Sequence, residues 1–110
     1  MRLTIPVAKV LSALLADPEA PRYGLDLMKL TGLPSGTLYP VLHRLQAAGW
    51  LAAEWEEVDP VTAGRPARRY YRLTGDGVRA ARLALAELRA LAPEGGTSRG
   101  GTEPTGAPAW

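Results

Sequence analysis

The chemically most informative residues of this chain lie in one stretch, from Pro34 to Leu51. Apolar residues recur there at helical spacing and would gather on one side of a helix. The opposite side has few charges, several small residues and groups that donate hydrogen bonds. Small residues permit close approach, and hydroxyl, imidazole and guanidinium groups reach phosphates or base edges in a nucleic-acid groove. The residues on or beside this outer side are Ser35, Gly36, Thr37, Tyr39, Pro40, His43, Arg44 and Ala47.

The ends of this expected helix are also marked in the sequence. Ser35 is predicted to be the N-cap, because its hydroxyl can accept a hydrogen bond from a backbone N–H of the first turn. Gly49 is predicted to end the helix in the left-handed conformation. Pro40 removes a backbone bond and crowds the carbonyl of Gly36, at a cost of roughly 3 kcal/mol, so we expect an irregularity near Gly36. The apolar side alone also fits a core helix of any small domain, and this stretch leaves both interpretations open.

A second set of candidate contacts lies in the charged residues further along the chain. The net charge is only +2, but it is unevenly distributed. The segment from Gly64 to Arg72 has four arginines and no acid, and an acidic run from Glu54 to Asp59 precedes it. A local basic stripe is the electrostatic pattern typical of nucleic-acid binding. The candidate contacts are Gly64, Arg65, Arg68 and Arg69.

Two strands are expected to carry these charges. Apolar and polar residues alternate from Leu51 to Glu56, and the segment from Arg69 to Leu73 is rich in tyrosine and apolar residues. Residues 58–67, with two prolines and a glycine, are typical of a loop. The sequence therefore predicts a β-hairpin with a long tip.

Pairing of opposite charges across this hairpin offers a structural explanation for some of the arginines. Glu54 would face Arg72 and Glu56 would face Arg69, each pair contributing roughly 0.2–1 kcal/mol. This pairing does not account for the arginines at the loop tip, for which we expect contact with phosphates or the minor groove. These are Arg65 and Arg68.

Helices are expected on both sides of the hairpin. The first spans about Thr4 to Ala16, and Thr4 can cap it. The second spans about Tyr23 to Leu30, with Gly32 as its stop. A short turn containing a glycine joins the second helix to the helix that starts at Ser35, which is the helix-turn-helix pattern.

The last helix is expected to begin at Thr74, whose hydroxyl can cap it. Its apolar residues follow a three-four spacing, typical of helices that pair with a twin. The alternative is that this stripe folds back on the chain's own core. We favour a dimer, because the stripe is long and the remaining core is small. The seam residues are Val78, Ala81, Leu85, Leu88 and Leu91.

These elements divide the chain into three parts. Residues 1–73 form the expected winged helix-turn-helix domain and residues 74–92 the dimerisation helix. Residues 93–110 are rich in Gly, Pro and Thr. Such a composition buries too little apolar surface to offset its ordering entropy, so we expect a disordered tail.

Several function classes are excluded or disfavoured by composition. The chain has one histidine and no cysteine, and its acids cluster in a strand whose alternate side chains point to opposite sides. No nucleophile–base pair or metal-ligand set is recognisable, so we expect no enzyme, no metal and no cofactor. No apolar run approaches the roughly 20 residues of a membrane span, and we expect a cytoplasmic protein.

Specific strings narrow the interpretation. SGTLYPVLHRLQAAGWL followed by GRPARRYYRLTGDG, together with YGLDL at Tyr23, resembles the PadR-like family of bacterial transcriptional regulators. The resemblance runs from about Ile5 to Leu91. The chain is similar to the short subgroup of the family, which has one helix after the β-hairpin, or wing.

The resemblance implies a mainly α fold with a small β-hairpin, a winged helix-turn-helix followed by a dimerisation helix. It implies a homodimeric repressor that binds a near-palindromic operator, with Ser35 to Arg44 in the major groove and Gly64 to Arg69 as the wing. It also implies release by a small hydrophobic or phenolic effector. Trp50 and Trp55 are candidates for the effector pocket, although packing in the hairpin core is the favoured alternative for them.

A function of a different class also fits these patterns. Winged helices dock onto proteins through the same helix or wing, so the chain could control another transcription factor or a sigma factor. Binding to its own upstream DNA at low salt discriminates between the two functions.

Overall fold

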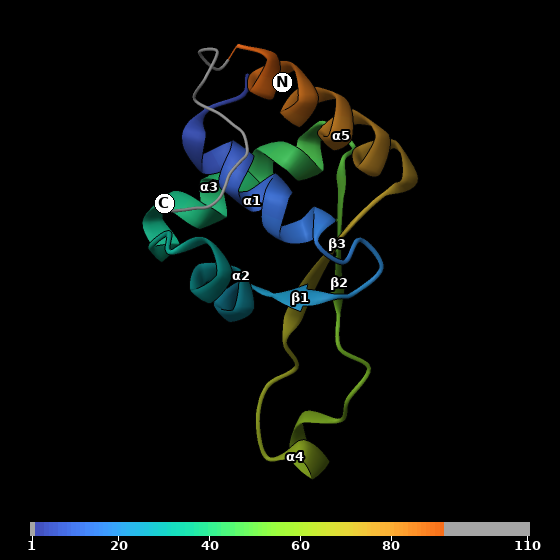
Figure 1. Ribbon diagram of the computed structural model, residues 1–110. Coiled ribbons are helices and arrows are strands. Elements are labelled where there is room, and N and C mark those ends of the chain that lie inside the picture. Colours follow the sequence, from blue (N-terminus) through green and yellow to red (C-terminus); the bar gives the residue numbers. More distant parts are fainter. Residues whose placement is uncertain (1, 92–110) are drawn as a thin grey trace, which may run out of the picture.

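The computed structural model describes residues 2–91 (Figure 1). This part of the chain is mainly helical, with a small antiparallel sheet, as predicted. The elements are α1 (Ile5–Leu15), β1 (Arg22–Tyr23), α2 (Gly24–Thr31), α3 (Ser35–Ala47), β2 (Leu51–Trp55), α4 (Pro60–Ala63), β3 (Arg69–Leu73) and α5 (Gly75–Ala90). The wing comprises β2, β3 and the residues between them.

Most predicted helix ends are confirmed by the hydrogen bonds at the caps. The Thr4 hydroxyl accepts a bond from the Val7 N–H at 3.3 Å, and the Thr74 hydroxyl accepts one from the Gly77 N–H at 2.9 Å. Gly32 adopts the left-handed conformation, with φ of 74°. These local signals are reliable because they need only residues near in sequence.

The start of α3 differs from the prediction. Pro34 is the N-cap, no side chain caps the helix, and Ser35 is already its first residue. The helix runs through Pro40 without a break, and the irregularity expected near Gly36 is not observed. Because Pro40 has no N–H, the carbonyl of Gly36 has no donor at its usual helical position. Gly36 lies in the exposed first turn of α3, where water can donate a hydrogen bond to this carbonyl.

The end of α3 is a Schellman turn that leads directly into β2. Gly49 has φ of 80°, as predicted, and the Trp50 N–H donates to the Leu45 carbonyl at 3.0 Å. A glycine is required here because the left-handed conformation is strained for other residues. This turn fixes where the wing leaves the helix.

The sheet has three strands in the order β1-β3-β2, one strand more than the predicted hairpin. β1 has two residues, too few for an alternation signal, and pairs with β3. In the β2–β3 register Leu51 lies opposite Leu73, and Trp55 lies opposite Arg69. The wing extends away from the helices, and the single-turn helix α4 lies at its tip (Figure 1). α4 lies within the segment predicted to be a loop.

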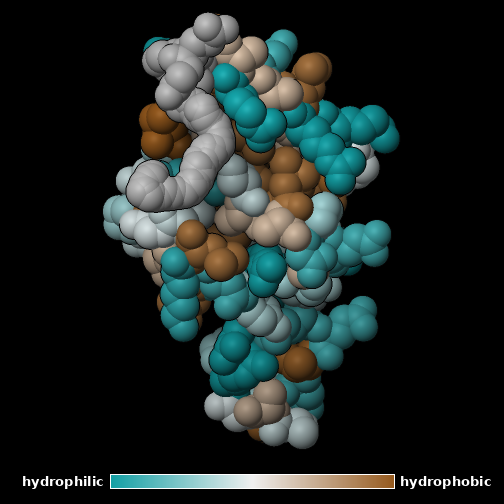
Figure 2. Space-filling view, in the orientation of Figure 1, coloured by the Kyte–Doolittle hydropathy of each residue, from teal (hydrophilic) through white to brown (hydrophobic). Residues whose placement is uncertain are grey.

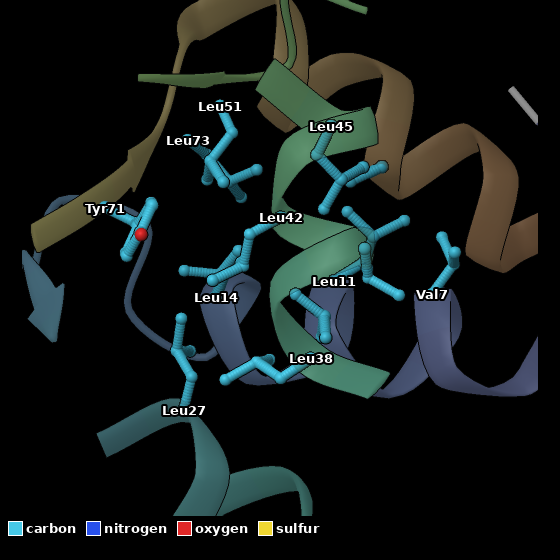
Figure 3. Packing of buried hydrophobic residues seen from close by; sticks show 13 residues of the cluster. Val7, Leu11, Leu14, Leu27, Leu38, Leu42, Leu45, Leu51, Tyr71 and Leu73 are labelled. Carbon is cyan, nitrogen blue, oxygen red and sulfur yellow. The ribbon is translucent and has the colours of Figure 1, made fainter. Parts of the chain in front are cut away.

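One hydrophobic core joins the helices to the sheet (Figure 3). α3 supplies its centre, since four of its side chains are at most 1 % exposed. α1 packs against them from one side and the sheet from another. The core residues are Val7, Val10, Leu11, Leu14, Leu27, Leu38, Val41, Leu42, Leu45, Leu51, Tyr71, Leu73 and Ala81.

The first half of the apolar stripe of α5 packs against the chain's own core. Ala81 is fully buried in the core, so its assignment to a dimer seam is wrong: no surface of it remains for a partner. Val78 and Leu85 are partly buried against the same core. Leu88 is half-buried and Leu91 is 81 % exposed, so within the predicted stripe exposed apolar surface remains only towards the end of α5. Leu83, which lies outside the stripe, is 63 % exposed.

No helix described between residues 2 and 91 is long and apolar enough to cross a membrane. The predicted disordered tail, residues 93–110, lies outside the described residues, as does the last residue of the predicted dimerisation helix.

Gly77 sets how closely α5 packs on the turn between α3 and β2. A Cβ at this position would lie 1.9 Å from the Trp50 carbonyl oxygen. The same oxygen accepts a bond from the Thr74 N–H at 3.0 Å, and the Thr74 hydroxyl donates to the Gly49 carbonyl at 2.8 Å. Any side chain at Gly77 therefore has to displace α5 from this turn.

We predict that Gly77→Ala lowers the free energy of unfolding by about 1–3 kcal/mol, because backbone atoms must move to admit the methyl group. Gly75→Ala is the matched control: its Cβ meets only Arg79, at 3.9 Å, so the change should be neutral or slightly stabilising. Urea unfolding at one fixed protein concentration measures both. Equal effects of the two substitutions would contradict the close contact at Gly77.

Candidate nucleic-acid interface

The outer face of α3 is exposed, as the sequence predicted. Gly36, Pro40, His43 and Arg44 are exposed, and Tyr39 is 42 % exposed. Part of this face is hollowed by a shallow groove of about 640 Å³, lined by Tyr39, Pro40, His43 and Arg44. Ser35 is exposed and Thr37 is half-buried. The face thus offers hydroxyl, imidazole and guanidinium groups on a helix whose opposite face is buried.

Tyr39 is held against the first residue of α2. Its hydroxyl oxygen lies so close to Gly24 that a Cβ there would be 2.1 Å from it. Gly24 is buried, and the Tyr39 ring covers it. The close contact at Gly24 was not predicted from the sequence, although the YGLDL string contains this glycine. The contact orients Tyr39 at the junction of α2 and α3.

Side-chain hydrogen bonds fix the positions of α2 and of the turn before α3. At the start of α2, the Tyr23 N–H donates to the Asp26 carboxylate at 3.0 Å. At its end, the buried Thr31 hydroxyl donates to the Leu27 carbonyl at 2.6 Å and accepts from the Leu33 N–H at 3.1 Å. The turn is thus bonded internally, which restricts the angle between the two helices.

Two of the four wing arginines are ion-paired with glutamates. Arg72 binds Glu54 at 2.9 Å, as predicted. The predicted Glu56–Arg69 pair is wrong: the register places Arg69 opposite Trp55, on the other face of the hairpin. Glu56 binds Arg65 instead, with Nη1 2.6 Å from one carboxylate oxygen and Nη2 3.3 Å from the other.

The Arg65 pair corrects a further expectation. Arg65 was expected to be unpaired at the loop tip, but the chain folds back around α4 and brings its guanidinium to Glu56, whose side chain is 11 % exposed. A contact of Arg65 with a phosphate would compete with this ion pair. Within the wing, the cations that remain for a ligand are therefore Arg68 and Arg69.

Arg68 and Arg69 stack on aromatic rings. The guanidinium of Arg68 lies 5.6 Å from the centre of the Tyr23 ring, and that of Arg69 lies 5.2 Å from the Trp55 ring. Such cation–π contacts are worth about 0.5–1 kcal/mol at exposed sites. They restrict the side chains and leave N–H groups available to bind an anion.

One cleft joins the outer face of α3 to the wing. It has a volume of about 560 Å³, and its walls come from α2, α3 and the returning side of the wing. Burial raises the pKa of Tyr71 further above neutral pH than that of an ordinary tyrosine. Hydroxyl and guanidinium donors thus converge on one concave surface, lined by Tyr23, Gly24, Leu25, Asp26, Tyr39, Arg68, Arg69 and Tyr71. In Figure 2, hydrophilic side chains cover much of the wing, and most of the apolar surface lies above it.

The two tryptophans proposed for an effector pocket do not lie together. Trp50 is half-buried and packs against the core before β2, whereas Trp55 is 58 % exposed at the other end of that strand. Neither lines any of the clefts described here. Core packing therefore holds for Trp50 and not for Trp55, which stacks with Arg69.

No group of three or more His, Cys, Asp or Glu side chains that could hold a metal ion occurs within residues 2–91.

The fold is that of the winged-helix class. This class is defined by a helix with one buried face and one outer face free for contact, and by a β-hairpin beside that helix.

The chain belongs to the PadR-like family of transcriptional regulators, because the model of that family matches residues 10–83. The family that this model describes consists of transcriptional regulators. It is 54 % identical over 54 residues to the transcriptional regulator Rv3488 of Mycobacterium tuberculosis (strain ATCC 25618 / H37Rv). The match covers 49 % of this chain and 42 % of that relative, so the chain spans less than half of its length.

Solved structures resemble the fold closely. A PadR-like transcription factor from Bacteroides fragilis is 29 % identical with a TM-score of 0.63, over 77 % of this chain and 81 % of that one. BpsR of Bordetella bronchiseptica, whose DNA binding is regulated by 6-hydroxynicotinic acid, is 25 % identical with a TM-score of 0.64. That likeness covers 81 % of this chain and 58 % of BpsR.

The geometry predicts an unusually acidic carboxyl group at Glu56. Hydrogen bonds from Arg65 and Tyr23 lower its pKa from 4.5 to about 2. Because the folded pKa is the lower one, the bonds contribute fully above about pH 4.5, and their contribution is lost as the pH falls toward 2. The carbon-13 shift of this carboxyl in an acid titration measures the midpoint, which should rise toward 4.5 in Arg65→Ala. A midpoint that Arg65→Ala leaves unchanged would contradict the ion pair.

Proposed function

We propose that this protein is a homodimeric, sequence-specific DNA-binding regulator, most simply a repressor released by a small effector. One observation carries the proposal: Tyr39 of α3 and Arg68 and Arg69 of the wing line a single cleft. A helix face and a basic hairpin that form one surface fit a duplex, whose major groove admits an α-helix while its phosphates run beside it.

In this proposal α3 enters the major groove. The groove is about 12 Å wide, and the small residues on the outer face, Gly36 and Ala47 among them, permit close approach. Tyr39, His43 and Arg44 would position the protein or contact base edges. The hydroxyls of Ser35 and Thr37, near the start of the helix, would donate to phosphates.

The wing would contact the backbone or the minor groove. Arg68 and Arg69 would supply its positive charge, and the left-handed turn at Gly64, with φ of 71°, would let the tip fold back. Each phosphate that an arginine neutralises releases counterions, so affinity should fall steeply with salt.

The proposed partner surface for a dimer is the groove between α1 and α5, at the end of the molecule remote from the wing tip (Figure 1). The groove holds about 830 Å³ and includes exposed Ile5 and Leu30 as well as Leu88. The helix α5 of a second copy would pack against the apolar residues of this groove, which is also lined by Lys9, Arg22 and Arg89. Residues 2–73 would then bind DNA and α5 would hold two copies with their α3 helices about 34–36 Å apart.

Release by an effector is proposed from the likeness to BpsR, whose DNA binding is regulated by 6-hydroxynicotinic acid. A compound that binds near the groove between α1 and α5 would change the angle between the two copies and hence the spacing of the α3 helices. The place of action would be the cytoplasm, where a bacterial promoter lies.

The experiment that tests the function is a gel shift and nuclease footprint on the DNA upstream of the protein's own gene, repeated across salt concentrations. Protection of two patches one helical turn apart is expected. Absence of binding even at low salt would contradict DNA binding and favour the alternative, a winged helix that docks onto another transcription factor or a sigma factor. Addition of hydrophobic or phenolic compounds to the complex tests release.

We predict that Arg68→Ala and Arg69→Ala each weaken binding to every duplex and flatten the slope of log affinity against log salt by about one unit. Fluorescence anisotropy with labelled duplexes measures this slope. Arg82→Ala is the control, because it removes the same charge from an exposed position on α5. A slope that falls equally in all three variants would contradict a specific contribution of the wing.

We predict that Leu88→Arg converts the dimer to a monomer, because it places a charge in the groove between α1 and α5. Ala86→Arg puts the same charge on the exposed side of the same helix and should leave the dimer intact. Sedimentation equilibrium measures the mass of both. Dissociation by Ala86→Arg but not by Leu88→Arg would place the dimer surface elsewhere.

A further inference from the structure

Glu56 binds more partners than any other side chain of the wing. Its carboxylate accepts bonds from both terminal nitrogens of Arg65, from the Tyr23 hydroxyl at 2.6 Å and from the Arg68 N–H at 2.9 Å. Its own N–H donates to the Arg68 carbonyl at 2.8 Å. We call Glu56, Arg65, Tyr23 and the Arg68 backbone the Glu56 cluster.

The cluster connects three separate segments. Tyr23 immediately precedes α2, Glu56 directly follows β2, and Arg65 and Arg68 lie on the returning side of the wing. Within residues 2–91, the bond from Tyr23 to Glu56 is the only side-chain hydrogen bond that links the wing beyond the sheet to the segment before α2. One carboxylate therefore joins both sides of the wing to the first helix of the helix-turn-helix.

Aromatic contacts extend the cluster to the cleft. The Tyr23 ring packs edge-on against Tyr70 of β3, with ring centres 6.3 Å apart, and its face carries the guanidinium of Arg68. The Tyr23 hydroxyl donates to the Glu56 carboxylate, and this hydrogen bond raises the pKa of Tyr23. The position of Arg68 thus depends on Tyr23, and that of Tyr23 on Glu56.

We propose that Glu56 is a positioning residue for DNA binding: with Arg65 it fixes the direction of the wing relative to α2 and α3, so that Arg68 and Arg69 meet the duplex together with Tyr39. Arg65 serves the wing internally and does not contact phosphate. The inference rests on the proposed function and adds to it an acidic residue that the interface requires.

The sign of one measurement separates this proposal from simple electrostatics. Glu56→Gln removes a negative charge from a surface that faces a polyanion, so charge alone would tighten binding. Loss of the positioning bonds would weaken it. The amide oxygen of glutamine can replace one acceptor, but it cannot bind the guanidinium as a charged, two-oxygen partner.

The matched control is Glu57→Gln. Glu57 is the next residue, is exposed, and forms no hydrogen bond or ion pair with the residues described. It carries the same charge at nearly the same distance from the duplex. We expect Glu56→Gln to weaken binding to the footprinted DNA about tenfold relative to Glu57→Gln, since bonds to charged groups are the strong ones.

A double-mutant cycle tests the pair itself. Arg65→Ala should weaken binding but leave the salt slope unchanged, because no phosphate contact is lost. Glu56→Gln should then have little further effect in the Arg65→Ala background. A slope reduced by about one unit would mean that Arg65 contacts a phosphate and would overturn its assignment to the wing.

Amide hydrogen exchange gives a second readout that needs no DNA. Exchange at Glu56 and Arg68 should quicken in Glu56→Gln and not in Glu57→Gln, with circular dichroism and melting temperature confirming that both variants fold. If wild type binds DNA and Glu56→Gln binds as tightly as Glu57→Gln, the positioning proposal is overturned, whatever the exchange rates. If wild type binds no DNA, the proposed function fails and with it the positioning proposal, while exchange still decides whether the cluster holds the wing.

Discussion

Burial of one face of α3 is the constraint on which the rest of the structure depends. Leu38, Val41, Leu42 and Leu45 are each at most 1 % exposed. At about 1.5–3 kcal/mol for each fully buried side chain, this contact dominates the local energetics. Because the period of a helix is fixed, burial of these residues turns Tyr39, His43 and Arg44 outward. Packing alone therefore presents a polar face on a rigid support.

The wing follows from the same constraint through the turn at Gly49. That turn sets where β2 starts, and Gly77 sets how closely α5 covers it. The charge on the wing is then divided between two uses. Arg65 and Arg72 neutralise glutamates of the hairpin, and Arg68 and Arg69 stack on rings with free N–H groups. The surface offered to an anion is smaller than the arginine count suggests, but better ordered.

Local signals in the sequence predicted the helices well. Caps at Thr4 and Thr74 and left-handed glycines depend on a few adjacent residues, so a single sequence contains them. The long strings around Tyr39 and Tyr70 identified the family for a similar reason. The outer face of α3 followed from helical periodicity alone.

Features that depend on distant residues could not be predicted in this way. The predicted Glu56–Arg69 pair was wrong because a shift of one residue in the strand register moves every side chain of the strand to the opposite face. Ala81 was assigned to a dimer seam because spacing does not tell which of two apolar surfaces a helix buries. The contact of Tyr39 with Gly24 joins residues of two helices and leaves no periodic signal.

The most direct test of the central claim is an NMR titration of the protein with the duplex that it protects. If α3 and the wing form one DNA-binding surface, the amide shifts that change most should lie between Ser35 and Arg44 and between Gly64 and Arg69. Those in the second half of α5 should change little. Changes confined to α5, or to only one of the two predicted segments, would contradict the account.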